Sequence, residues 1–166
     1  MKTRKLTLMA ALTAIALTIF IAESQIPPVV PVPGVKLGLS NIITLVTMAY
    51  LGRKEAGAVL VVRILMGSMF AGSVSSLLFS MTGGALAWLV MALLIGLFPE
   101  KLIWVVSIFG AIAHNAGQLA AAIFVTGTPG LIYYGAALLA AAIITGAFTG
   151  VASMYLLRAM KKLNLK

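Results

Sequence analysis

The polar side chains that could do chemistry in this chain are few, and most lie in one short segment. Residues 110–118 contain the only histidine, His114, followed by Asn115 and Gln118. His114 and Gln118 are four residues apart and so share one face of a helix, with Asn115 beside them. Imidazole and amide groups in this pattern can bind a solute or can hydrogen-bond a neighbouring helix. Both roles are open at the level of the sequence.

A second group of interest is Arg63, which lies within an apolar run. It follows the polar turn 52–55 by about eight residues, which is roughly 12 Å at the rise of an α-helix. A charge at that depth in a membrane costs at least about 2.5 kcal/mol on insertion scales, so it faces a partner, a cavity or water. Binding of an anion, a coupling interface and a purely structural pairing all fit. The three carboxylates, Glu23, Glu55 and Glu100, all lie near the ends of apolar runs.

The composition decides the class of protein. Hydrophobic residues make up 62% of the 166 residues and charged residues 9%, with a mean hydropathy of +1.15. A soluble domain carries about 25% charged residues. We therefore expect an all-α integral membrane protein, and this length holds about six spans of about 20 residues each. No room remains for a separate soluble domain.

The six expected spans form a single transmembrane domain over residues 1–166. They are residues 6–22, 38–51, 56–79, 85–98, 102–126 and 131–157, with an uncharged turn at 80–84 between the third and the fourth. Alternating the sides places ten basic residues in the connections and termini on one side and only Lys36 on the other. The positive-inside rule then predicts that both termini are cytoplasmic, in a prokaryotic cell membrane.

The connection between the first two expected spans is unusual. It contains four prolines, Pro27, Pro28, Pro31 and Pro33, among apolar residues. Proline excludes the interior of a helix, and irregular backbone at membrane depth survives only where it is buried in protein or lines a cavity. We expect this segment to be the lid or wall of a binding site.

Several functions are excluded by residues that the chain lacks. It has no cysteine and no aspartate, and a lone histidine cannot build a metal site, so no metal or other cofactor is expected. Prenyl diphosphate synthases hold Mg²⁺ with clusters of carboxylates, and ATPases need a Gly-Lys-Ser/Thr motif. We therefore expect no enzymatic activity. The basic residues form no stripe that would bind nucleic acid.

Three segments together resemble the Gx transporter family, also labelled heptaprenyl diphosphate synthase component I. They are residues 33–41 (PGVKLGLSN), 63–68 (RILMGS) and 110–118 (GAIAHNAGQ). That family is similar in architecture to the substrate-binding S components of energy-coupling factor (ECF) transporters. The resemblance implies a six-helix S-component-like bundle with its ligand site in the outer half, capped by the first connection. It also implies that Ala10 and Ala14 match the Ala-xxx-Ala element that meets a membrane coupling subunit driven by two cytoplasmic ATPases.

Our interpretation is the substrate-binding subunit of an ECF-type importer for a small anionic, partly apolar solute, such as a vitamin or an isoprenoid or quinone precursor. Lys36 and Arg63 would meet the anion. Hydrogen bonds would come from Asn41, His114, Asn115 and Gln118, and Tyr133 and Tyr134 would add apolar walls. Two alternatives stay open: an accessory membrane subunit of a prenyl diphosphate synthase, and a solitary channel-like or efflux protein.

Overall fold

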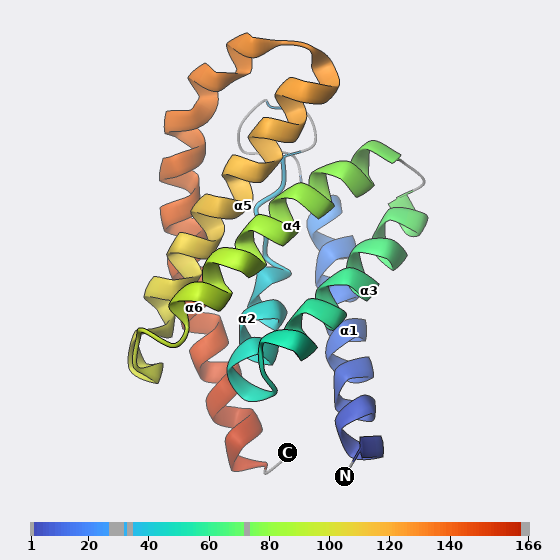
Figure 1. Cartoon of the computed structure of the whole chain (residues 1–166), viewed down its shortest axis with the longest axis vertical. Helices are drawn as coiled ribbons and strands as arrows, with labels where there is room; N and C mark the ends of the chain where they lie inside the picture. The colour runs from blue at the N-terminus through green and yellow to red at the C-terminus, as the bar shows by residue number, and fades with distance from the viewer. Residues whose placement is uncertain (1, 27–31, 33–34, 72–73, 164–166) are drawn as a thin grey trace.

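The computed structural model describes residues 2–26, 32, 35–71 and 74–163. Within these ranges the chain forms six α-helices and two short 3-10 helices (Figure 1). The helices are α1 (Lys2–Ser24), α2 (Asn41–Tyr50), α3 (Arg53–Ala71), α4 (Val74–Leu94), η1 (Glu100–Leu102), α5 (Ile103–Thr126), η2 (Pro129–Tyr134) and α6 (Gly135–Lys162). The expected all-helical fold is confirmed for this part of the chain.

Four of the helical segments are long and apolar enough to cross a membrane. They are Thr3–Ser24, Val74–Leu94, Glu100–Thr126 and Pro129–Lys162. α2 has 10 residues, about 15 Å at the helical rise, which is half the thickness of a hydrocarbon core of about 30 Å. α2 is mostly buried, and it lies in the middle of the bundle with longer helices around it (Figure 1).

The start of α1 and the end of α6 lie at the same end of the molecule (Figure 1). Side-chain contacts join elements at this end. Lys5 of α1 forms an ion pair with Glu55 of α3, and Lys161 of α6 forms one with Glu100 of η1.

The predicted turn at residues 80–84 is wrong. Ser80 to Gly84 lie inside α4, which begins at Val74, and α3 ends at Ala71; residues 72–73 are outside the described residues. Gly83 and Gly84 allow close packing, because a Cβ on Gly83 would lie 2.8 Å from Cγ of Gln118 in α5. The glycine pair that resembles a turn signal in the sequence is a helix contact in the structure.

α5 packs against α4 on one side and α6 on the other through small residues. A Cβ on Gly117 would lie 2.7 Å from the Thr82 carbonyl oxygen, and one on Gly146 would lie 2.6 Å from Cα of Ile108. Gly150 makes the same kind of contact, since a Cβ there would lie 2.5 Å from Cα of Trp104. These contacts fix the position of α5, which carries His114 and Gln118.

Candidate functional site

A small polar cavity lies in the interior, toward the end of the bundle opposite the termini. Its volume is about 10 Å³, which is room for about one water molecule. Side chains of α1, α3, α4 and α5 meet there with the end of the connection that precedes α2. The lining residues are Phe20, Glu23, Lys36, Gly38, Ser40, Arg63, Ser80, His114 and Gln118.

Arg63 is the most unusual of these residues because it is buried and only partly hydrogen-bonded. It is 2% exposed, and its Nη1 donates a hydrogen bond to Ser40 Oγ at 2.6 Å. Nε and Nη2 have no hydrogen-bond partner in the described part of the chain. A guanidinium stays protonated, and an unsatisfied buried donor costs free energy. These two nitrogens are therefore suited to donate hydrogen bonds to an acceptor that is not part of this chain.

Glu23 is a lining residue that the sequence interpretation missed. It is 4% exposed and lies in the last turn of α1. Its carboxylate accepts a hydrogen bond from the Gly38 backbone N–H. Among the described residues it forms no ion pair with Arg63 or Lys36. The available signal was a carboxylate at the end of an apolar run, directly before the proline-rich connection.

Lys36 and Gln118 hold the connection against α5. The Lys36 backbone N–H donates to Oε1 of Gln118 at 3.0 Å. The Lys36 ammonium lies 3.9 Å from the centroid of the Phe20 ring, and the Arg63 guanidinium lies 5.7 Å from the same centroid. Both cations are thus within the range of a cation–π interaction with one ring. Val32, which is 1% exposed, adds an apolar contact from the connection to the bundle.

His114 closes the cavity on the α5 side and is 5% exposed. It packs tightly against the connection, because a Cβ on Gly38 would lie 2.9 Å from His114 Cδ2. Gly38 also has a φ of +77°, a left-handed conformation that glycine adopts at low cost. A glycine is therefore needed here for two independent reasons.

The structure brings four of the six predicted binding residues to the cavity, namely Lys36, Arg63, His114 and Gln118. Asn41 lies next to it, since a Cβ on Gly38 would lie 3.1 Å from Asn41 Nδ2. Asn115 has another role, donating from Nδ2 to the Leu138 carbonyl of α6 at 2.9 Å. Tyr133 and Tyr134 are 87% and 38% exposed in η2 and do not line the cavity.

A family model described as heptaprenyl diphosphate synthase component I matches residues 12–156. This chain belongs to that family. The resemblance inferred from residues 33–41, 63–68 and 110–118 is confirmed at the level of this family label. No curated protein and no solved structure matches the chain.

The synthase in the family's description raises the question of a catalytic metal site. Among the described residues no three His, Cys, Asp or Glu side chains lie close enough to hold a metal ion. Of the three glutamates, Glu23 lines the cavity, whereas Glu55 and Glu100 form ion pairs with lysines at the end where the termini lie. The described carboxylates of this family member are therefore separated from one another.

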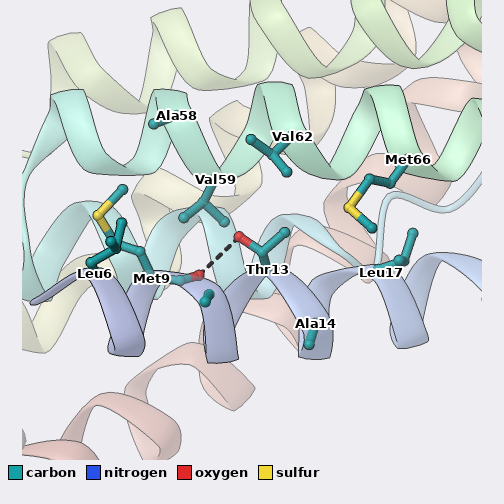
Figure 2. A pocket seen from close by; sticks show the side chains of 10 residues that line it. Leu6, Met9, Thr13, Ala14, Leu17, Ala58, Val59, Val62 and Met66 are labelled. Carbon is teal, nitrogen blue, oxygen red and sulfur yellow. Dashed lines mark hydrogen bonds between the residues drawn. The ribbon is translucent and has the colours of Figure 1, made fainter. Parts of the chain in front are cut away.

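The second candidate site is an apolar groove between α1 and α3, with a volume of about 370 Å³ (Figure 2). It is lined by Leu6, Met9, Ala10, Thr13, Ala14, Leu17, Ala58, Val59, Val62 and Met66. Ala10 and Ala14 are exposed, so neither residue is covered by another helix of this chain. The Thr13 hydroxyl donates to the Met9 carbonyl at 2.8 Å and so leaves no polar group free along this stretch of α1 (Figure 2).

Proposed function

We propose that this member of the heptaprenyl diphosphate synthase component I family is the substrate-binding membrane subunit, or S component, of an ECF-type importer. Its solute is small, anionic and partly apolar, such as a vitamin or an isoprenoid or quinone precursor. The observation that carries the proposal is Arg63, a buried cation that lines the interior cavity and whose Nε and Nη2 have no hydrogen-bond partner among the described residues. A membrane protein that keeps such a group uses it for a ligand, a relay or a pathway.

In the proposed mechanism the solute enters from the side of the membrane opposite the termini. Arg63 and Lys36 bind its anionic group, while His114, Gln118 and the adjacent Asn41 supply hydrogen bonds. The present cavity holds about one water molecule. Residues 35–40 must therefore move from α5 and α1 to admit a solute, which breaks the contacts of Gln118 with Lys36 and of Glu23 with Gly38.

Other polypeptides supply the energy in this proposal, because the sequence has no ATP-binding motif. The exposed groove that contains Ala10 and Ala14 is the proposed contact for the coupling subunit. Small side chains allow a partner helix to approach closely where no hydrophobic effect drives association in lipid. Two cytoplasmic ATPases then act on the coupling subunit.

The deciding experiment is purification of the full chain from its native membrane in a mild detergent, followed by identification of the proteins and small molecules that accompany it. We expect a coupling subunit and two ATPases. Ala14→Leu should reduce their recovery at least several-fold, whereas Ala22→Leu, at the other end of α1, should not. If Ala14→Leu leaves the recovery of the ATPases unchanged, the groove is not part of the interface.

Uptake of the co-purified small molecule tests the cavity separately. Arg63→Ala and Lys36→Ala should weaken uptake while the protein stays in the membrane. Unchanged uptake would exclude both residues from the binding site.

The family's description favours a second candidate, an accessory membrane subunit of a prenyl diphosphate synthase. In that case the purification would recover a soluble synthase in place of the ATPases. Substitutions at Arg63 would then leave the association unchanged, because the contact would lie at the end of the bundle where the termini are.

A further inference from the structure

We infer that the cavity takes the carboxylate of a monocarboxylic acid with an apolar body, and that it selects against phosphate and diphosphate esters of the same body. The inference rests on the proposed binding function and specifies the headgroup that the site recognises.

The two unpartnered nitrogens of Arg63 favour an anion that presents two oxygens side by side. Nε and Nη2 lie on one edge of the guanidinium, and their N–H bonds are parallel, which matches two oxygens of a carboxylate or of a phosphate in a bidentate pair. The selection between these two headgroups therefore comes from charge. The third nitrogen, Nη1, is already bonded to Ser40. Gly84 of α4 lies beside Nη2, since a Cβ there would lie 3.7 Å from this atom and 3.1 Å from Ile64 Cδ1. This contact is close, so the carboxylate enters only when residues 35–40 move and the cavity opens.

The charges around the cavity allow for one negative charge. With Glu23 ionised and His114 neutral, the two cations Lys36 and Arg63 leave one net positive charge at the cavity. A monocarboxylate neutralises it. A phosphate monoester carries about −1.5 to −2 at neutral pH, and it would place excess negative charge in a dry interior close to Glu23, where an unpaired charge is costly.

An apolar body has a place next to the headgroup. A buried apolar cluster that includes Val32, Phe79 and Leu119 continues along the chain from the cavity, since Phe79 precedes Ser80 and Leu119 follows Gln118. Its buried members are aliphatic and aromatic side chains. It can therefore cover an alkyl or isoprenoid body but offers no partner for a second charged group.

The test measures binding to the purified full chain in nanodiscs, without partner proteins. Two sets of ligands keep the body constant and change the headgroup: octanoate, octyl phosphate and octanol, and geranate, geranyl diphosphate and geraniol. We expect at least one of the two carboxylates to bind about tenfold or more tighter than the matched alcohol and the matched phosphorylated compound. The alcohol loses the charge-assisted bidentate pair, and the phosphorylated compound brings additional negative charge into a dry interior next to Glu23. Equal or tighter binding of the phosphorylated compounds, or no binding of either carboxylate, overturns the inference.

Two variants separate shape from charge. Arg63→Lys keeps the charge but lacks the two parallel N–H donors, so carboxylate binding should fall about tenfold or more. Unchanged carboxylate binding would contradict the assignment of Arg63 to the headgroup. Glu23→Gln keeps the shape but adds one positive charge to the site, so the preference should move toward the phosphorylated ligands. If a variant does not fold, as judged by its elution volume and Tm, the comparison of headgroups on the unmodified chain still decides.

This outcome is independent of the proposed importer. Selective carboxylate binding without co-purified ATPases would retain the headgroup and remove the ECF assignment. Co-purified ATPases together with tighter diphosphate binding would retain the ECF assignment and remove the carboxylate headgroup.

Discussion

A buried arginine and a buried glutamate lie at the same cavity here without forming an ion pair with one another. Each is instead tied to the backbone or side chain of the connection before α2, with Glu23 bonded to Gly38 and Arg63 to Ser40. Removing one partner of a buried contact leaves the other unsatisfied and costs about 1–3 kcal/mol. At the scale of the residue, these two side chains decide where the connection lies.

Glu23→Ala should release residues 35–40 from the bundle, because the Gly38 N–H loses its acceptor. We expect faster hydrogen exchange at Gly38 and a loss of about 1–3 kcal/mol of stability. Glu23→Gln retains an acceptor oxygen and serves as the matched control. Exchange that rises equally in both variants would show that the charge of Glu23, and not its hydrogen bond, holds the connection.

The ion pair at the opposite end of the bundle predicts a dependence on pH. The hydrogen bond from Lys5 lowers the pKa of Glu55, which lies in the first turn of α3. A lowered folded-state pKa gives a stabilising contribution that is present above the unfolded-state value and is lost as the pH falls through the folded-state value. The Tm difference between the unmodified chain and Glu55→Gln should therefore be present, and small, at neutral pH and vanish in acid. High salt should also reduce it; a difference that persists in acid would argue for a packing effect.

At the scale of the element, α5 is the helix whose position matters most, because it carries His114 and Gln118 and contacts both α4 and α6. The glycines of these contacts bring the backbones together. A Cβ at position 117 of α5 would clash with the Thr82 carbonyl oxygen of α4. A backbone carbonyl cannot move aside as a flexible side chain does. The cavity therefore depends on how closely α4 and α5 approach.

Gly117→Ala should push α4 from α5 and destabilise the protein by about 1–3 kcal/mol, the usual cost of overpacking. It should also weaken ligand binding, because Gln118 moves with the helix. Gly135→Ala is the control, since its Cβ would make only an ordinary contact of 3.8 Å with Leu119 Cδ2. Thermal unfolding in detergent measures both, and equal Tm values would contradict the close contact.

For the whole molecule, the arrangement of charge and the arrangement of helices agree. Both termini lie at one end (Figure 1), the ion pairs of Glu55 and Glu100 lie there, and the cavity lies toward the other end. If the termini are in the cytoplasm, as the positive-inside rule proposes, the cavity lies toward the outer side of the membrane. That orientation suits capture of an external solute.

The absence of cysteine makes this orientation testable. A single cysteine at Thr3 should react with a membrane-impermeant maleimide only after the cells are opened, whereas one at Thr128, in the turn between α5 and η2, should react in intact cells. Both positions are outside or at the ends of the apolar helices, so the substitutions should not affect folding. Labelling of Thr3→Cys in intact cells would reverse the proposed orientation.

The sequence was sufficient for the fold class and for much of the polar cluster. Spacing alone put His114 and Gln118 on one face, and depth alone identified Arg63 as a residue that needs a partner or a cavity. The prediction of a turn at residues 80–84 failed, because glycine and serine occur both in turns and in close helix contacts. Only the position of the neighbouring helix distinguishes a turn from a helix contact. The sequence interpretation also assigned Asn115 to the ligand, whereas the structure shows this side chain bonded to Leu138.

The sequence by itself determined that this chain consists of apolar helices, carries its positive charge at one end, and buries a cation that its own carboxylates do not obviously neutralise. These properties follow from composition and from position along the chain. The tertiary structure alone decided that Glu23 and Phe20 reach the same cavity as Lys36 and Arg63. The physical reason is that this meeting depends on how residues 35–40 pack against α1 and α5, and the position of an irregular segment is set by its long-range contacts rather than by any local pattern.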